Sequence, residues 1–153
     1  MSEPDKAFNV DKAEDSPGFL LWQVTTSWHR AIKKALDEID ITHPQFVILA
    51  SLLWLSKTKT SVTQIDLSQH SKIDPMTTST IIKTLLRKGM VERREHETDT
   101  RAKAVTLTDS GVAISRQAVQ IINKVDADFF KGLGEDVKGF NVMLVGLMKA
   151  NGA

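Results

Sequence analysis

The segment from Val62 to Thr108 constrains the fold more than any other part of the chain. It contains a short amphipathic stretch, a turn, a longer helical stretch and two short segments around a polar tip. Asp74 is a favourable N-cap, and Pro75 is tolerated at the first helical position because its missing N–H would be unpaired there. Gly89 suits the left-handed residue that ends many helices. The pattern therefore predicts a helix that begins at Pro75 and ends just before Gly89.

One side of this predicted helix is apolar and the other is free to contact a partner. Ile81, Ile82 and Leu85 recur at helical spacing and form the apolar face. The early positions of the opposite face carry short, polar or flexible side chains, namely Met76, Thr77, Ser79, Thr80 and Lys83. We treat these residues as a candidate contact surface.

The two segments after the helix predict an antiparallel hairpin. Residues 90–95 and 101–107 show mixed alternation, and the tip at 96–100 is wholly polar. A helix–turn–helix followed by a charged hairpin is the plan of the winged helix–turn–helix. In that plan the second helix enters the DNA major groove, and the hairpin reaches the backbone or the minor groove.

The charge of the chain is uneven, although the net charge is only +1. Between Ile81 and Arg94 there are five basic residues and one acidic residue, whereas the first fifteen residues lean acidic. A local basic patch on a nearly neutral protein fits contact with phosphates better than nonspecific polycationic binding. The chain has no cysteine, which excludes disulfides and thiolate metal sites.

Further capping signals predict the helices before the hairpin. Thr42 and Gln45 form a capping box that begins a helix, and the apolar run 46–55 predicts burial on most sides. Ser61 with Gln64 repeats the pattern and is expected to open the short helix of the motif. On that helix we expect Ile65 and Leu67 to point inward.

The two ends of the chain carry more apolar surface than a lone DNA-reading lobe needs. Ser16 and Pro17 predict the start of a helix with an apolar stripe to Ile39, and two more helices are expected after residue 108, broken by Gly132 and Gly134. A second subunit is the simplest cover, and two-fold symmetry would place the two reading helices ~34 Å apart, one turn of DNA.

These expectations divide one compact domain into three parts. Residues 1–16 are a flexible N-terminal arm, residues 17–40 and 109–153 are dimerisation helices, and residues 41–108 are the winged helix–turn–helix lobe. The fold class is mainly α with a small antiparallel β-hairpin wing.

Three stretches resemble the MarR family of transcription regulators: ITHPQFVILASL, IDPMTTSTIIKTLLRKGMVERR and DTRAKAVTLTDSG. The resemblance covers roughly residues 41–114, and its most specific part is the pair Asp99-x-Arg101 followed by VTLTDSG. It implies a homodimer that binds pseudo-palindromic double-stranded operator DNA, usually as a repressor. It also implies release of the DNA when a small, commonly aromatic, ligand binds between the lobes.

The resemblance also assigns roles to single residues. Arg101 would enter the minor groove or clamp the backbone, and Asp99 would orient it through a charge-assisted hydrogen bond. The residues facing the major groove would be Thr77, Ser79, Thr80 and Lys83, and those serving the hairpin through phosphates would be Arg93, Arg94 and Lys103. Family members often carry arginine in place of Thr80 and an acidic residue in place of Lys83, so the base preference of this chain is left open.

Trp22, His29 and Phe46 allow two interpretations. They either line a pocket for an aromatic carboxylate or a similar effector, or they belong to the core. Asp66 and His70 lie four residues apart on a helix, but a closed metal site needs more than two ligands. We therefore predict no metal site and no cofactor.

Two other function classes remain as alternatives. A winged helix can bind protein instead of DNA, although the basic hairpin with Asp99-x-Arg101 argues for phosphate contact. A small enzyme is the other alternative, but the chain lacks the His-Glu-x-x-His and Gly-x-Ser-x-Gly motifs and a phosphate-cradling glycine loop. No stretch approaches the length of a membrane span and the N-terminus does not resemble a signal peptide, so we expect a cytoplasmic protein without membrane contact.

Overall fold

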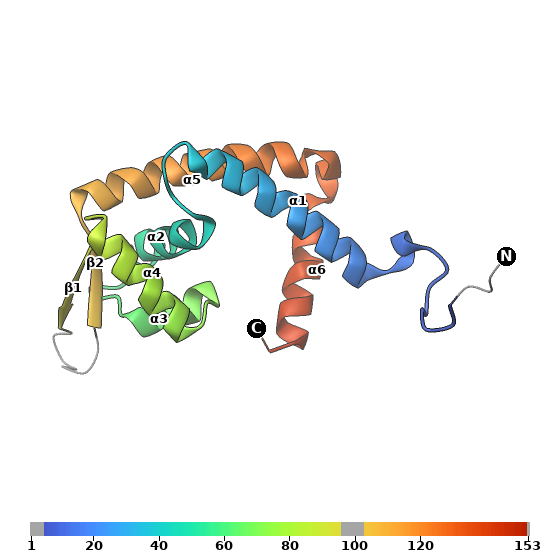
Figure 1. Ribbon diagram of the computed structural model, residues 1–153, viewed down its shortest axis with the longest axis horizontal. Helices are drawn as coiled ribbons and strands as arrows, with labels where there is room; N and C mark the ends of the chain where they lie inside the picture. Colours follow the sequence, from blue (N-terminus) through green and yellow to red (C-terminus); the bar gives the residue numbers. More distant parts are fainter. Residues whose placement is uncertain (1–4, 96–102, 153) are drawn as a thin grey trace.

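The structure is a computed structural model that describes residues 5–95 and 103–152. The elements in chain order are η1 (Ala13–Asp15), α1 (Pro17–Asp37), α2 (His43–Leu55), α3 (Gln64–Ser71), α4 (Pro75–Arg87), β1 (Val91–Glu95), β2 (Lys103–Leu107), α5 (Asp109–Phe130), η2 (Lys131–Asp136) and α6 (Val137–Ala150). The helices α2 to α4 and the hairpin form one lobe, α1 and α5 pack side by side beyond it, and α6 turns away at the far end of α5 (Figure 1). The predicted fold class, mainly helical with a two-stranded wing, is confirmed.

Most helix ends lie where the capping signals predict them. The Thr42 hydroxyl accepts from the Gln45 N–H at 3.3 Å, and the Gln45 side-chain oxygen accepts from the Thr42 N–H at 3.1 Å. The Asp74 carboxylate accepts from the Thr77 N–H at 2.9 Å, and Gly89 follows α4 with φ +72°. These local signals hold because each satisfies a backbone group that the helix itself leaves unpaired.

The predicted start of α3 is wrong by two residues. The capping box uses Thr63 and Asp66 rather than Ser61 and Gln64. The reason is long-range pairing, since Val62 accepts a hydrogen bond from Val105 of β2 and the next residue bridges to the same strand. This pairing keeps residues 62–63 extended, so the helix begins after them.

Burial around α2 and α3 also departs from the sequence prediction at two positions. Leu67 is fully buried as predicted, but Ile65 is 61% exposed on the other side of α3. Trp54, in the last turn of α2, is 61% exposed and packs against the Lys57 ammonium, 4.2 Å from the ring centre. α2 is therefore buried on one side and half-buried along much of the other, and Trp54 near its C-terminal end is exposed.

Two apolar clusters form the core. The larger lies within the lobe and includes Ile48, Leu52, Leu85 and Val105, while the smaller joins α1 to α5 through residues such as Leu36. Ile39 and Phe46 pack against both clusters. Because close-packed interiors transmit displacement, this shared contact couples the lobe to α1 and α5.

The wing is fixed to α5 by a tight junction. The Thr108 hydroxyl donates to the Gly89 carbonyl at 2.7 Å and accepts from the Gly111 N–H at 3.0 Å. A Cβ atom at Gly111 would overlap the Met90 carbonyl oxygen. Glycine is therefore required at this position for the close approach of backbone to backbone.

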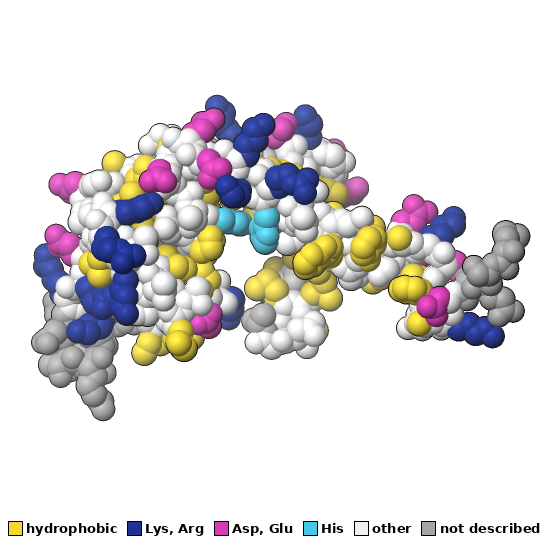
Figure 2. Space-filling view, viewed as in Figure 1, with side chains coloured by type: hydrophobic (Ala, Val, Ile, Leu, Met, Phe, Trp, Pro, Cys, Tyr) yellow, Lys and Arg dark blue, Asp and Glu magenta, His cyan; other side chains and the backbone are white. Residues whose placement is uncertain are grey.

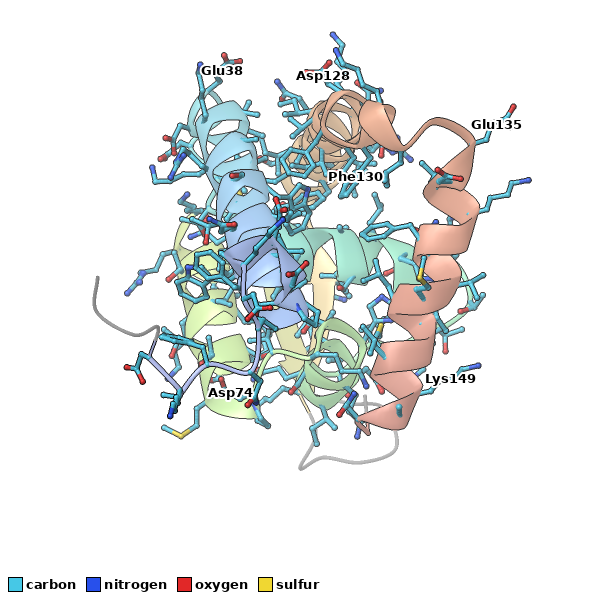
Figure 3. All side chains as sticks on the ribbon, turned by 90° about the vertical axis from the view of Figure 1, so that its right-hand side faces the viewer. Glu38, Asp74, Asp128, Phe130, Glu135 and Lys149 are labelled. Atoms are coloured by element: carbon cyan, nitrogen blue, oxygen red, sulfur yellow. The ribbon has the colours of Figure 1, made fainter. Side chains whose placement is uncertain are left out.

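Most of α6 extends away from the other helices, although Phe140 in its first turn lies against Phe130 at the end of α5, with ring centres 6.1 Å apart. The helix begins at Val137, after the break predicted at Gly132 and Gly134, and Gly134 with φ +54° interrupts the helical path inside η2. None of its fourteen residues, all of them described, is buried. Figure 3 shows α6 separated from α1, with Glu135 and Lys149 near its two ends. None of the described helices combines the length and the apolar character that a membrane crossing requires.

Candidate nucleic-acid interface

The outer face of α4 is exposed along its whole length. Met76 is 83% exposed, and Thr77, Thr80, Lys83 and Arg87 are also exposed. The opposite face is closed by Thr78, Ile81, Ile82 and Leu85, all of them buried. Of the five contact residues proposed from the sequence, only Ser79 is half-buried, on the flank of the helix.

The hydroxyl groups on this face are largely engaged within the helix. Thr77 donates to the Asp74 carboxylate at 2.6 Å, and Thr80 donates to the Met76 carbonyl at 3.1 Å. The hydrogen bond from the Thr77 hydroxyl, followed by that from its N–H, lowers the pKa of Asp74. Asp74 therefore remains ionised at the N-terminus of α4, where the helix dipole favours a negative charge.

The basic residues of the wing divide between its two faces. In the antiparallel register Arg93 lies opposite Val105 and Arg94 lies opposite Ala104. Arg94 is exposed and pairs with Glu92 at 3.1 Å, and Lys103 is also exposed. Arg93 shares a face with buried Val105, and its Nε and Nη2 atoms are buried without a hydrogen-bond partner in the described part of the chain.

Lys88, the residue that follows α4, is engaged in hydrogen bonds within the protein. Its ammonium donates to the Asp40 carbonyl at 2.6 Å and to the Gln45 side chain at 3.4 Å. This basic residue therefore ties the end of α4 to the start of α2. The two wing-tip residues proposed from the sequence, Asp99 and Arg101, lie outside the described residues.

α4 and the wing present their cations on one edge of the lobe. Figure 2 shows Lys and Arg side chains gathered over α4 and the neighbouring strand. The exposed basic residues of α4 and the described part of the wing are Lys83, Arg87, Arg94 and Lys103. A helix with an open face beside a basic strand is an arrangement that suits a phosphate-lined groove.

A pocket of about 600 Å³ lies between α1, the start of α2 and the turn before α4. Its walls include His29 and Lys33 from α1, His43 from α2, and Ile73 and Thr77 from the α3–α4 turn and α4. Figure 2 shows histidine side chains together at the hollow between the lobe and α1. A mixed wall of imidazole, ammonium and apolar groups suits a small anionic ligand with an apolar body.

The structure separates the three residues proposed for the effector. His29 lines the pocket, whereas Phe46 is not among the lining residues and stacks on His43, with ring centres 6.4 Å apart. Trp22 is 70% exposed and is not among the residues that line this pocket. Two further lining residues, Lys33 and His43, were missed in the sequence. Lys33 lies four residues after His29 on the same helix, so helical spacing could have paired them. His43 lies on α2, and no sequence spacing relates it to His29.

The two pocket histidines face each other. The ring centres of His29 and His43 are 5.3 Å apart, and the Trp28 ring lies 5.1 Å from that of His43. Burial, and then the nearby His29, lowers the pKa of His43, while Asp126 on α5 acts in the opposite direction. His43 is therefore mainly neutral near pH 7 and can both donate and accept a hydrogen bond.

Asp66, one of the two residues weighed as metal ligands in the sequence, has other partners in the structure. Asp66 completes the α3 capping box and pairs with the Lys59 ammonium at 2.8 Å. Burial, the largest single influence, would raise the pKa of Asp66, but the hydrogen bonds with Lys59 and Thr63 together lower it. Within residues 5–95 and 103–152, no group of three His, Asp or Glu side chains is placed to hold a metal ion.

The chain is similar to a winged-helix family and to an HTH-type transcriptional regulator over most of its length. A family model described as "ArnR1-like, winged-helix domain" matches residues 37–126. The HTH-type transcriptional regulator YdcH of Bacillus subtilis is 42% identical over 115 residues, which cover 75% of this chain and 78% of YdcH. These relatives are transcription regulators rather than enzymes.

Two solved structures extend the likeness to the whole fold. A single-residue mutant of MarR from E. coli, crystallised with operator DNA, is 27% identical with a TM-score of 0.77, covering 88% of this chain and 95% of that one. BpsR of Bordetella bronchiseptica, whose DNA binding is regulated by 6-hydroxynicotinic acid, is 21% identical with a TM-score of 0.79, covering 92% of this chain and 98% of that one. At 21% identity, the likeness to BpsR concerns the fold alone. The chain belongs to the MarR family of winged helix–turn–helix transcriptional regulators.

Proposed function

We propose that the chain is a homodimeric repressor that binds a pseudo-palindromic operator and releases it when a small aromatic acid binds. The observation that carries the proposal is the open face of α4 beside the exposed cations of the wing. In a helix–turn–helix the second helix enters the major groove, and here that helix is α4. The protein–DNA contacts are assigned to the side chains proposed from the sequence: Met76, Thr77, Ser79, Thr80 and Lys83 on α4, and Arg93, Arg94, Asp99, Arg101 and Lys103 on the wing.

The dimer is supported by apolar surface that the single chain leaves open. On α6 the exposed apolar residues are Val142, Met143, Val145, Leu147 and Met148, and on the first half of α1 they are Phe19, Leu20, Leu21, Trp22 and Val24. Figure 2 shows exposed hydrophobic side chains on both α1 and α6. A second copy that covers both helices would bury this surface, and a two-fold axis would give two reading helices.

Within this proposal the wing contributes mainly through phosphates. Arg94 and Lys103 are exposed and able to reach the backbone of the duplex. Two guanidinium nitrogens of Arg93, Nε and Nη2, are buried. Arg93 would therefore either contact a phosphate through the rest of its guanidinium group or stabilise the wing without contacting DNA. Arg101, which lies outside the described residues, is assigned the minor groove or backbone at the tip, with Asp99 as its orienting partner.

The effector is assigned to the pocket between α1, α2 and α4. His29, His43 and Lys33 offer donors to a carboxylate, and Val47 and Ile73 offer apolar contact to a ring. Thr77 lines the same pocket and also holds the Asp74 cap of the reading helix. A ligand there would bridge the dimerisation helix α1 and the start of α4, and it would change the spacing of the two reading helices.

Selection of bound sequences from random duplex DNA tests the DNA-binding part of the proposal. We expect a two-fold-related site whose half-site centres lie about one helical turn apart. Arg101→Ala should weaken binding to the selected duplex by at least about tenfold while the dimer stays intact, as measured by gel shift beside light scattering. Unchanged binding by that variant would remove the role assigned to the wing tip.

A ligand screen tests the effector separately. Aromatic carboxylates should raise the melting temperature and release the selected duplex, and His43→Ala with His29→Ala should lose both effects. The alternative, a winged helix that binds protein, predicts that selection recovers no duplex at all.

A further inference from the structure

We infer that Met76 and Thr80 read the C5-methyl groups of thymines, so that each half-site carries thymine opposite the first two turns of α4. The inference rests on the proposed function, because it specifies what α4 recognises once it lies in the major groove. Methyl contact is the readout that apolar and threonine side chains make at A·T pairs.

The first support is the order of side chains along the outer line of α4. Met76, Thr80, Lys83 and Arg87 are separated by four, three and four residues, so they follow one another on the same face. All four are exposed. The N-terminal end of the line is therefore apolar and the C-terminal end is cationic. In helix–turn–helix proteins the N-terminal residues of the reading helix contact base edges, so the apolar end is the one that meets the bases.

The second support is the use of hydrogen-bond donors on the first turns of α4. The Thr80 hydroxyl donates to the Met76 carbonyl at 3.1 Å, and the Thr77 hydroxyl donates to Asp74 at 2.6 Å. A hydroxyl hydrogen that is already directed to the protein is not available to the O6 or N7 acceptors of guanine. What Thr80 offers outward is its methyl group and oxygen lone pairs.

The third support is the exposure of Met76. It is 83% exposed, the highest value among the large apolar side chains in the described part of the chain. It lies in the first turn of α4, beside the engaged hydroxyl of Thr80. A long unbranched thioether adapts to an irregular apolar surface, and a row of thymine methyl groups in the major groove is such a surface.

Together these features divide recognition between the two ends of the helix. Lys83 and the half-buried Ser79 keep donors for acceptor groups or phosphates, whereas Met76 and Thr80 contribute apolar contact. The proposed preference for thymine follows from the side chains available on the outer face of α4. It specifies the base preference that the sequence left open, because Thr80 and Lys83 stand where family members often carry arginine and an acidic residue.

The test pairs a one-methyl change in the DNA with a one-methyl change in the protein. In a duplex obtained by selection, each thymine of the half-site is replaced in turn by deoxyuridine, which removes only the C5 methyl. Thr80→Ser removes only the corresponding side-chain methyl and keeps the hydroxyl. Met76→Ala removes the thioether, and Lys83→Ala serves as the matched control. Affinities are measured by fluorescence anisotropy for all combinations.

We expect deoxyuridine at one or more half-site positions to weaken wild-type binding about fourfold per methyl group removed. Thr80→Ser or Met76→Ala should bind the thymine duplex more weakly and lose the discrimination at the matching position. Lys83→Ala should weaken both duplexes and keep the discrimination.

Two results would overturn the inference while leaving DNA binding intact: equal affinity of the wild type for thymine and deoxyuridine duplexes, or selected half-sites without thymine. Recovery of no duplex at all would instead overturn the proposed function, and the inference with it. Because Met76 and Thr80 are exposed, near-identical circular dichroism and melting curves for the variants are expected and serve to verify that they fold.

Discussion

The indole nitrogen of Trp28 on α1 donates a hydrogen bond to the Asp126 carboxylate on α5 at 2.8 Å. The pair is partly buried and joins residues 98 positions apart in the chain. It lies beside the smaller core cluster, so it adds a directional contact to an otherwise apolar junction between the two helices. The same Trp28 ring also faces His29 and His43, which connects this junction to the pocket.

Replacement of Trp28 by Phe should therefore destabilise the fold beyond the loss of ring area. The variant keeps an aromatic ring but removes the N–H donor, and a hydrogen bond of this kind contributes about 1 kcal/mol. Urea unfolding should show a lower midpoint at unchanged slope. Asp126→Asn, which keeps an acceptor for the indole, should lose less stability than Trp28→Phe. Equal losses for the two variants would contradict the assigned hydrogen bond.

The stability of the fold should decrease with acidification because of His43. Its pKa in the folded state is lowered from 6.5, first by burial and then by His29 of α1, while Asp126 of α5 acts in the opposite direction. The unfolded chain therefore binds more protons below pH 6.5, so this contribution is complete above pH 6.5 and is lost as the pH falls towards the lowered pKa. Melting temperatures measured across this range should fall less steeply for His43→Gln than for the wild type. Identical slopes would exclude His43 as the source.

Gly111→Ala should strongly destabilise the fold, although it adds only one methyl group. A methyl group at this position would overlap the Met90 carbonyl oxygen, and Leu107 lies 3.2 Å away, so the backbone of the wing junction would have to move. Overpacking of this kind costs about 1–3 kcal/mol.

Gly18→Ala is the matched control, because a methyl group there meets nothing within 4 Å. Glycine in the middle of a helix costs about 0.5–1 kcal/mol relative to alanine, and Gly18 lies in the first turn of α1, so the exchange should stabilise by no more than this. Chemical denaturation of both variants gives the comparison. A neutral or stabilising effect of Gly111→Ala would show that the junction yields more easily than its geometry indicates.

The open surface of α6 predicts a dimer that a single charge can separate. Leu147 is 58% exposed in the single chain, so Leu147→Glu should leave the fold of each chain intact. In the proposed two-fold interface the residue would occur twice, so the change should raise the dissociation constant of the dimer by at least about a hundredfold. Lys149→Glu, an exposed charge reversal two residues away, controls for charge alone. Sedimentation equilibrium that finds the wild-type chain monomeric would contradict the assignment of α6.

The reading helix was predictable from sequence because its signals are local. Asp74, Pro75 and Gly89 each act on backbone groups within one turn, and the hairpin follows from short-range alternation. The start of α3 was not predictable in this way. Its position depends on the pairing of Val62 with Val105, which lies more than forty residues away.

In the candidate site, too, local features were predictable from the sequence and long-range contacts were not. The exposed face of α4 follows from helical periodicity, and four of its five proposed residues are exposed as expected. The pocket is different, since His43 meets His29 only through the packing of α1 on α2. The apolar run of α2 likewise did not indicate that Trp54 would be exposed, because a sequence that is apolar on all sides has no preferred face.

The central claim is that two copies of the chain hold a duplex through α4 and the wing, with phosphate contacts supplying much of the affinity. The most direct measurement is the affinity for a selected duplex as a function of salt, with the mass of the complex determined in parallel. We predict two chains per duplex and a loss of about a thousandfold in affinity between about 50 and 200 mM salt. A monomeric chain that binds no duplex at low ionic strength would contradict the claim.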